Sequence, residues 1–390
     1  MEKRKRYMEI KSATLGLNSK FKIGVLTSSR ADFGIYYPLV KKLVNHSLFN
    51  LEIIAFGTHL DQNYGYTIDE IHSYGFEVKH QIKTLTLNKN PNETSKSIGD
   101  TILKFSEFWK TNEFDLVFCL GDRYEMFAAV SASLTFGVNL AHLHAGETTL
   151  GAVDNVFRHS ISLMCKYLFV STEKYRKRAI QINNNPGSVY NVGALSVDNL
   201  ENLSYYSKKE FNDKFNIDLT IPTILSTFHP ETISLSKNSQ YIDELIMSFN
   251  ELKERYQIVI TMPNSDTLGD MIREKIIDFS KDLEQVKLVE SFGMKGYLSC
   301  MKHCSFLLGN TSSGFVEASY FPKKVINLGQ RQSGRIITEN ILNIPIEKNS
   351  IIDAVSKIEK TVVGANENIY KKGNTSDNII DIISSLKLTK

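Results

Sequence analysis

Residues 114–159 read FDLVFCLGDRYEMFAAVSASLTFGVNLAHLHAGETTLGAVDNVFRH. The stretch contains two short apolar runs, 116–120 and 138–143, with an apolar helical segment between them. Short apolar runs bounded by glycine indicate buried strands of a parallel sheet. Because open parallel sheets bind ligands at the carboxyl ends of their strands, we expect a functional site where these two runs end.

Each run ends in a polar turn that carries an acid. Asp122 follows the first run, Glu147 follows the second, and Asp154 lies on the next segment. Neighbouring parallel strands end at the same edge of a sheet, so the three carboxylates should converge. Acids after strands can also simply cap the next helix, but two consecutive strands ending in this way favour a functional site. Side chains expected close to the acids are those of Arg123, His142, His144 and Arg158.

The composition is typical of a soluble protein, with 42% hydrophobic and 23% charged residues. A length of 390 residues predicts two domains. The net charge of +3 gives no case for a nucleic-acid partner, and no apolar run is long enough to span a membrane. The basic start lacks the apolar segment of a signal peptide. The four cysteines are expected to be buried free thiols, and we interpret the chain as cytoplasmic.

Strands and helices alternate throughout, which predicts an α/β fold of two Rossmann-like domains. The expected strands are 21–27, 51–57, 77–82, 116–120, 138–143, 167–172 and 189–193, then one from 223, 256–261, 286–289, 304–308 and 325–328. The expected helices include 36–46, one from about residue 67, 92–110, 173–182 and 377–386. We divide the chain into an N-terminal extension (1–20), a first domain (21–199), a polar linker (200–222), a second domain (223–374) and a C-terminal helix (375–390) that crosses back to the first domain.

A loop rich in Ser, Gly and Arg follows the first strand, at residues 27–34. In such a loop, free backbone N–H groups and the dipole of the next helix would face a phosphate, and Arg30 would pair with it. The loop matches no established phosphate-binding motif, so an ordinary strand-to-helix turn is an equal alternative.

The loop at residues 309–314, GNTSSG, is a stronger candidate for binding phosphate. Ser312, Ser313 and a helix start would point at one anion. Glu317 is either a carboxylate that accepts hydrogen bonds from a ribose or an acid favoured by the helix dipole. Arg331 and Arg335 add donors near the next strand end. Two such loops on two Rossmann-like halves imply a diphosphate-bearing ligand in the cleft between them.

Taken together, these motifs resemble the hydrolysing UDP-N-acetylglucosamine 2-epimerases of bacterial sialic-acid pathways. The resemblance covers about residues 21–390 and rests on seven segments. They are SRADFG (29–34), GDRYE (121–125), HLHAGE (142–147), Asp154 with Arg158-His159, HPET (229–232), 310–317 and RQSGR (331–335). One departure is Ala145, where the family often has Gly.

The resemblance implies a fold of the GT-B type with the active site in the interdomain cleft, and a homo-oligomer, dimeric or tetrameric. It implies conversion of UDP-N-acetylglucosamine and water to N-acetylmannosamine and UDP, through 2-acetamidoglucal, with neither cofactor nor metal. It assigns acid/base chemistry to Asp122, Glu147 and Asp154, without fixing which abstracts and which donates, and places His229 near the leaving oxygen. The residues that it implies for substrate binding are Arg30, Arg123, Asn264, Ser291, Phe292, Ser312, Ser313, Glu317 and Arg331.

Carboxylates packed together repel one another, so we expect at least one pKa among the three acids to rise. Alternatives remain open. A related branch acts on UDP-2,4-diacetamido-2,4,6-trideoxy-glucose, and non-hydrolysing 2-epimerases, GT-B glycosyltransferases and nucleotide-sugar sensors would share much of the pattern. A metal on His142, His144 and Glu147 is geometrically possible on a strand. We expect instead that one histidine packs in the core and the other orients a carboxylate.

Overall fold

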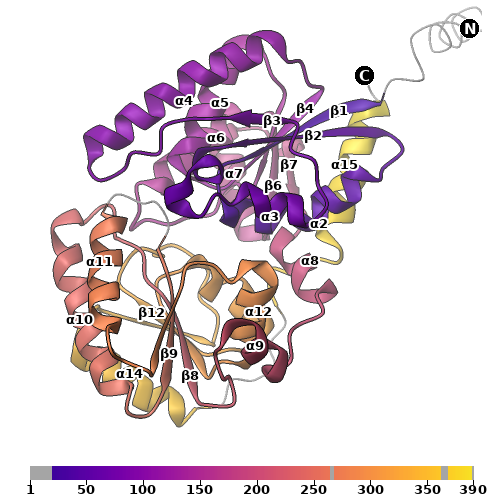
Figure 1. Cartoon of the computed structure of the whole chain (residues 1–390). Helices are drawn as coiled ribbons and strands as arrows, with labels where there is room; N and C mark the ends of the chain where they lie inside the picture. The colour runs from indigo at the N-terminus through magenta and orange to yellow at the C-terminus, as the bar shows by residue number, and fades with distance from the viewer. Residues whose placement is uncertain (1–19, 264–267, 362–367, 389–390) are drawn as a thin grey trace, which may run out of the picture.

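The computed structural model describes residues 20–263, 268–361 and 368–388 (Figure 1). The predicted extension, apart from Lys20, and Asn264 lie outside the described residues. Two parallel sheets, each covered by helices, lie one above the other in Figure 1. This arrangement confirms the predicted α/β fold of two Rossmann-like halves.

The first sheet has, within the described residues, seven strands in the order β3-β2-β1-β4-β5-β6-β7. They are β1 (Phe21–Thr27), β2 (Phe49–Phe56), β3 (His80–Ile82), β4 (Leu116–Leu120), β5 (Leu140–Leu143), β6 (Tyr167–Val170) and β7 (Val189–Asn191). All pairs are parallel, and every residue of β4 and β5 is buried. Burial on both faces is why these strands read as continuous apolar runs.

The second sheet has, among the described residues, six parallel strands in the order β10-β9-β8-β11-β12-β13. They are β8 (Thr223–Thr227), β9 (Gln257–Thr261), β10 (Val286–Val289), β11 (Phe306–Gly309), β12 (Val325–Leu328) and β13 (Ile341–Ile344). The edge strand β13 was missed in the sequence because half-exposed side chains interrupt its apolar pattern.

Helices cover both faces of each sheet. Those of the first half are α2 (Arg30–Val44), α3 (Ile68–Ser73), α4 (Pro91–Thr111), α5 (Tyr124–Ser133), α6 (Asp154–Met164), α7 (Glu173–Asn183) and α8 (Leu195–Asn202). The others are α9 (Lys208–Phe215), α10 (Asn238–Leu252), α11 (Gly269–Ser280), α12 (Gly293–His303), α13 (Glu317–Tyr320), α14 (Lys348–Glu359) and α15 (Thr375–Leu388). Short 3-10 turns are η1 (Gly57–Leu60), η2 (Gln62–Tyr64), η3 (Leu134–Phe136), η4 (Pro186–Ser188), η5 (Leu235–Lys237) and η6 (Ser312–Gly314).

The start of α2 corrects one prediction. The helix begins at Arg30, not at Tyr36, because the carboxylate of Asp32 satisfies the backbone donors at its N-terminus. Arg30 therefore belongs to the first helical turn.

The segment 200–222, predicted as a polar linker, contains the end of α8 and all of α9. Phe211 of α9 is fully buried against Phe292 and Cys300 of the second half. A few apolar side chains within a polar stretch are enough to dock this helix on the second core.

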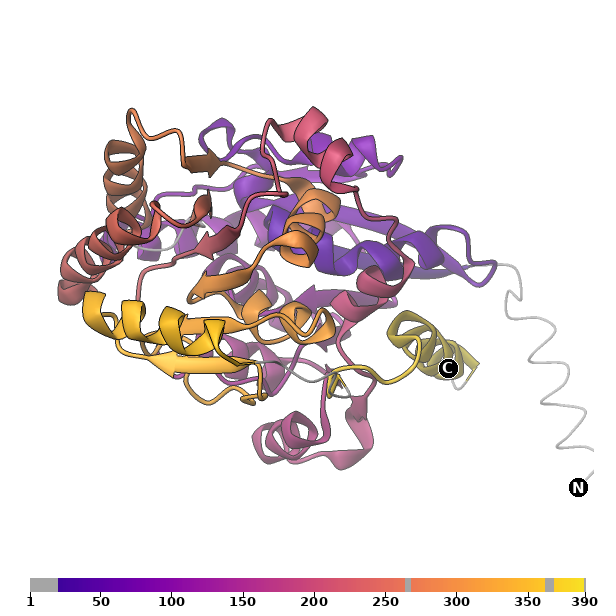
Figure 2. The ribbon, with the colours of Figure 1, turned by 90° about the horizontal axis from the view of Figure 1, so that it is seen from below.

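The last helix, α15, packs on α2 and α8 rather than on the second half. Ile379 and Ile383 are fully buried in the core cluster of β1 and α2. Asp198 of α8 accepts hydrogen bonds from the backbone N–H groups of Thr375 and Ser376, which fixes the start of α15. The chain thus returns to the first half, as both views show (Figure 1, Figure 2).

All four cysteines are buried and free, as predicted. No helix in the described ranges has both the length and the apolar content needed to cross a membrane.

Candidate active site

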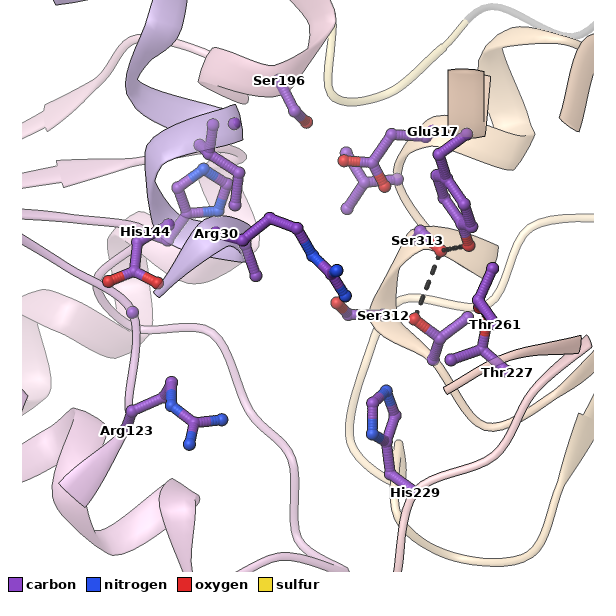
Figure 3. A pocket seen from close by; sticks show the side chains of 18 of the residues that line it. Arg30, Arg123, His144, Ser196, Thr227, His229, Thr261, Ser312, Ser313 and Glu317 are labelled. Atoms are coloured by element: carbon purple, nitrogen blue, oxygen red, sulfur yellow. Dashed lines mark hydrogen bonds between the residues drawn. The ribbon is translucent and has the colours of Figure 1, made fainter. Parts of the chain in front are cut away.

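A cavity of about 350 Å³ lies between the carboxyl ends of the two sheets. Figure 3 shows side chains of both halves reaching into it. Its lining includes these residues singled out from the sequence: Arg30, Asp122, Arg123, Glu147, Asp154, His229, Ser291, Phe292, Ser312, Ser313, Glu317 and Arg331. Such a volume is in the range of small-molecule sites, so the cavity is the candidate active site.

Glu147 lies in the turn after β5 and is almost fully buried. One carboxylate oxygen, Oε1, accepts hydrogen bonds from His144 Nδ1 at 2.8 Å and from Ser171 Oγ at 3.0 Å. The other, Oε2, pairs with Arg335 Nη1 at 2.8 Å and lies 3.9 Å from Arg158 Nη1. Ser171 was not predicted as a site residue, because a serine after a strand has no distinguishing sequence pattern.

These partners show that the rise in pKa expected for at least one of the three acids does not fall on Glu147. Burial alone would raise its pKa, but the charges of His144 and Arg335, the hydrogen bond from His144 and the charge of Arg158 hold the pKa well below its usual range. Glu147 is therefore ionised at neutral pH. Our expectation considered repulsion between acids and neglected the cations placed among them.

Asp122 and Asp154 reach the cavity from neighbouring elements. Asp122 follows β4 and forms an ion pair with Arg158 Nη2 of α6. Asp154 is the first residue of α6, so Asp154 and Arg158 lie one helical turn apart. Arg158 is buried and also donates to the backbone oxygen of His144 at 3.1 Å, which ties the two acid-bearing turns together.

The two histidines of β5 and its following turn have different roles, as predicted. His142 is buried in the core, with Nδ1 3.0 Å from Ser162 Oγ and Nε2 2.8 Å from the backbone oxygen of Gly121. Burial lowers the pKa of His142 to about 3. His144 lies beyond the strand end in a left-handed conformation and contacts Glu147. His142 thus packs in the core, while His144 orients the Glu147 carboxylate.

The first loop is not the open phosphate seat that we considered. Its donors are taken by Asp32, whose carboxylate accepts from Ser28 N at 2.7 Å, Ser28 Oγ at 2.9 Å, Ser29 N at 3.2 Å and Ser29 Oγ. Arg30 instead extends across the cavity, where Nη1 donates to the backbone oxygen of Glu290 at 2.8 Å (Figure 3). The alternative of an ordinary turn describes this loop's backbone.

The second loop offers hydroxyl groups to the cavity. Ser313 Oγ lies 2.6 Å from the Tyr297 hydroxyl and 3.2 Å from Thr311 Oγ1, the two dashed contacts in Figure 3. Ser312 begins the 3-10 turn η6, so the N–H groups at its start lack intrahelical partners. Tyr297 was missed because it lies within α12, where a tyrosine is normally a packing residue.

Two further residues of the second half are fixed around this loop. The Asn310 side chain accepts from the backbone N–H of His229 at 2.7 Å and donates to its carbonyl at 2.8 Å. Glu317 begins α13, and burial raises the pKa of its carboxyl. The charges of His144 and Arg335 oppose this rise in the pKa of Glu317 without cancelling it.

Two expected binding residues are engaged with protein neighbours. Arg123 Nη2 and Nε contact the buried Glu125 carboxylate at 2.9 and 3.2 Å, which fixes the guanidinium plane. Phe292 lines the cavity while its ring packs against Phe211 and Phe215 of α9. Both residues are thus held in place before any ligand arrives.

Two facing Rossmann-like sheets with a polar cavity between their carboxyl ends define the GT-B type of fold. The structure is similar to that of a UDP-GlcNAc 2-epimerase from Neisseria meningitidis bound to UDP-GlcNAc. The TM-score is 0.80 at 19% sequence identity, over 94% of this chain and 100% of the other.

The family model for UDP-N-acetylglucosamine 2-epimerase matches residues 41–384. Among curated relatives, polysialic acid biosynthesis protein P7 of Escherichia coli is 34% identical over 95% of both chains. The hydrolysing GDP/UDP-N,N'-diacetylbacillosamine 2-epimerase of Campylobacter jejuni is 34% identical over 87% of this chain and 88% of the relative. The corresponding UDP-dependent enzyme of Legionella pneumophila is 30% identical over 94% and 96%. The chain belongs to the UDP-N-acetylglucosamine 2-epimerase family.

Proposed function

We propose that this chain is a hydrolysing epimerase that converts UDP-N-acetylglucosamine and water into N-acetylmannosamine and UDP, for sialic acid synthesis. The observation that carries the proposal is the ionised, buried Glu147 on one wall of a cleft whose other wall presents Ser312 and Ser313. The identity to the E. coli polysialic acid protein and to two hydrolysing relatives supports it.

The second half is proposed to hold UDP. Ser312 and Ser313 would donate to diphosphate oxygens, with Arg30 and Arg331 supplying positive charge from both sides of the cavity. Glu317 would accept hydrogen bonds from the ribose hydroxyls, which suits a buried carboxyl whose pKa is raised by burial. Ser291 and Phe292, next to the backbone oxygen that Arg30 contacts, would border the base.

The first half is proposed to transfer the protons. Glu147, ionised at rest, accepts the C2 proton; the C–H electrons form the C1–C2 double bond, and the C1–O bond to the diphosphate breaks to release UDP. Water then adds to C1 of 2-acetamidoglucal, and C2 receives a proton on the opposite face. The donor is Asp122 or Asp154, since Glu147 serves the other face of C2 in the first step.

His229 and Arg123 would stabilise the leaving diphosphate as negative charge develops on it. His229 is aimed by the Asn310 clamp on its backbone, and Arg123 by its paired contact with Glu125. Preorganised groups of this kind need no rearrangement at the moment of reaction.

A second candidate substrate is UDP-2,4-diacetamido-2,4,6-trideoxy-glucose. The two relatives that act on UDP-N,N'-diacetylbacillosamine, at 34% and 30% identity, favour it. The chemistry at C1 and C2 is the same for both sugars, so the catalytic acids do not discriminate between them.

A direct comparison of the two substrates tests the proposal. The purified protein is incubated with each UDP-sugar at equal concentration, and UDP release and the free sugar are followed by chromatography. We expect a higher kcat/KM for UDP-N-acetylglucosamine, with free N-acetylmannosamine as product. A preference for the diacetamido sugar would transfer the assignment to that branch, and UDP-N-acetylmannosamine as the end product would indicate a non-hydrolysing epimerase.

We also propose that the protein acts in the cytoplasm as a homo-oligomer, a dimer or tetramer. Exposed apolar side chains of Val156 and Leu163 on α6, and of Leu134 and Phe136 in η3, which follows the neighbouring helix α5, support an interface on the first half. Light scattering after size exclusion checks the assembly, and a monomer at micromolar concentration would contradict it.

A further inference from the structure

One buried ion pair of the acid cluster joins the two halves of the molecule. Glu147 follows β5 of the first sheet, and Arg335 follows β12 of the second, yet Arg335 Nη1 lies 2.8 Å from Glu147 Oε2. Both side chains are almost completely buried. Arg335 is therefore a part of the Glu147 environment that is supplied across the cleft.

Arg335 is itself held by the loop system of the second half. Its Nε donates to Gln332 Oε1 at 2.6 Å, and Gln332 Nε2 donates to the backbone oxygen of Asn310 at 2.8 Å. Asn310 clamps the backbone of His229 and immediately precedes the Thr311-Ser312-Ser313 segment. A continuous chain of hydrogen bonds thus connects the proposed diphosphate seat to Glu147.

The backbone that carries Glu147 is docked on the same turn. Leu150 N donates to the Ser333 backbone oxygen at 2.8 Å, and Gly151 lies so close to Gln330 that a Cβ would come within 2.1 Å of its carbonyl oxygen. The contact exists only when the two halves are together. Separation of the halves would therefore remove Arg335 from Glu147 and admit water to both.

We propose that Arg335 is a positioning residue that couples domain closure to the orientation and charge environment of Glu147, so that Glu147 has its full set of cationic partners only in the closed enzyme. The inference rests on the proposed function, in which Glu147 accepts the C2 proton. It adds that the loops proposed to hold UDP also position Arg335, which contacts the proposed base Glu147 on the opposite wall.

Several other titratable or charged groups face Glu147. They are His144 in the same turn, Arg158 of α6, Tyr175 of α7 and Tyr370 ahead of α15, with Asp122 paired to Arg158. All except Arg335 and Tyr370 belong to the first half and stay with Glu147 when the halves separate. Tyr370 lies just before α15, where the chain returns to the first half. Its backbone oxygen accepts a hydrogen bond from Ala194 N of the first half. Arg335 is accordingly the partner whose removal reports closure.

The sign of the pH effect follows from this arrangement. Losing a cation beside a carboxylate raises the pKa of the carboxylate, by about 1–3 units for a close partner. Catalysis needs the ionised form, so a higher pKa moves the loss of activity on the acid side to higher pH. The free enzyme samples the open form, and kcat/KM reports the free enzyme. The fall of kcat/KM on the acid side should therefore occur at higher pH than the fall of kcat.

The test is the pH dependence of kcat and kcat/KM for the wild type, Arg335→Gln and Arg335→Lys. We expect Arg335→Gln to move the acid limb of kcat up by about 1–2 pH units and to merge it with that of kcat/KM. Arg335→Lys keeps the positive charge and should leave the limb near its wild-type position while lowering kcat. The matched control is Arg255→Gln, which removes an exposed Arg255–Glu359 pair of the second half and should leave both limbs unchanged.

An unchanged acid limb in a folded Arg335→Gln variant overturns the proposal, as does an equal displacement in Arg335→Lys. If Arg335→Gln does not purify as a folded protein, Gln332→Glu replaces it, since the new carboxylate competes with Glu147 for Arg335 and should raise the limb in the same direction. An acid limb of kcat at its wild-type position in Gln332→Glu would also overturn the proposal.

A second measurement separates this inference from the proposed function. Small-angle X-ray scattering needs no turnover: Arg335→Gln should give a larger radius of gyration than the wild type at neutral pH, with or without UDP, whereas Arg255→Gln should not. Wild-type protein that turns over no UDP-sugar would refute the function while this scattering result still stands. Equal radii with normal turnover would refute the coupling alone.

Discussion

The two walls of the cleft differ in the kind of side chain that they present. The first-half wall is a set of paired charges, in which Asp122 and Glu147 are interleaved with Arg158 and, across the cleft, Arg335. The second-half wall presents neutral hydroxyls around Ser313 and the Tyr297 hydroxyl, with Glu317 and Arg331 beside them. Paired charges fix a reactive group in one ionisation state, whereas hydroxyls adapt their donors to a ligand. The difference suits one wall to proton transfer and the other to holding a nucleotide.

The two strand-to-helix loops show the same contrast at smaller scale. The loop after β1 uses its own Asp32 to satisfy Ser28 and Ser29. The loop after β11 has no acid at the corresponding place and leaves its serines facing the cavity. Loops with similar composition thus differ in the groups that they present to the cavity, because one contains an internal anion.

The largest expected effect is on the charged wall. Glu147→Gln should lower kcat by at least about 100-fold, the usual contribution of a positioned general base. UDP affinity should stay within about threefold of the wild type by calorimetry, because only the proton-transfer wall is altered.

The control for that variant is Glu52→Gln, which changes another buried glutamate with cationic partners, Lys22, Lys79 and His80, away from the cavity. It should retain wild-type kcat. Near-normal turnover by Glu147→Gln would remove Glu147 from the catalytic group.

A smaller effect is expected on the hydroxyl wall. Ser313→Ala removes a donor to the diphosphate and should weaken UDP binding by about tenfold, as for a hydrogen bond to a charged group. Calorimetry with UDP measures it, and Ser248→Ala, a buried serine of α10 whose hydroxyl bonds only within its helix, is the matched control. Equal affinity of the two variants would show that the second loop does not bind the diphosphate.

The smallest effect on ligand binding is expected in the first loop. Asp32→Asn should lower the free energy of unfolding by about 1–3 kcal/mol, because an amide cannot accept all the hydrogen bonds that the carboxylate accepts. UDP affinity should remain within about twofold, since this loop's donors already serve the protein. Urea unfolding and calorimetry check the two parts.

Asp198→Asn, which alters the aspartate at the start of α15, should behave in the same way. A tenfold loss of UDP affinity in Asp32→Asn alone would mean that the first loop is a binding loop after all.

Local sequence patterns predicted the strand ends and loops whose structure depends on adjacent residues. The apolar runs that end at Gly121 and at the His144–Glu147 turn marked the strand ends, and GNTSSG marked the hydroxyl loop. These features depend on a few adjacent residues whose geometry is fixed by strand and helix periodicity. The catalytic and binding roles assigned to them remain predictions for the experiments above.

The features that the sequence concealed depend on distant partners. The lowered pKa of Glu147 comes from His144 in the same turn and also from Arg335, which is 188 residues away in the chain. The donors of the first loop are occupied because of the rotamer of Asp32, and no sequence pattern encodes that rotamer. Helix α9 forms in a polar stretch because Phe211 meets the aromatic rings of a later segment. Tertiary contacts decide each case.

The most direct test of the central claim is turnover of UDP-N-acetylglucosamine in D2O, followed by proton NMR. We predict free N-acetylmannosamine that carries deuterium at C2, together with one equivalent of UDP, because the C2 proton passes to an exchanging carboxylate before water adds. Release of UDP with the original proton retained at C2 would contradict proton transfer by the acid cluster, and release of no free sugar would contradict the hydrolysing reaction.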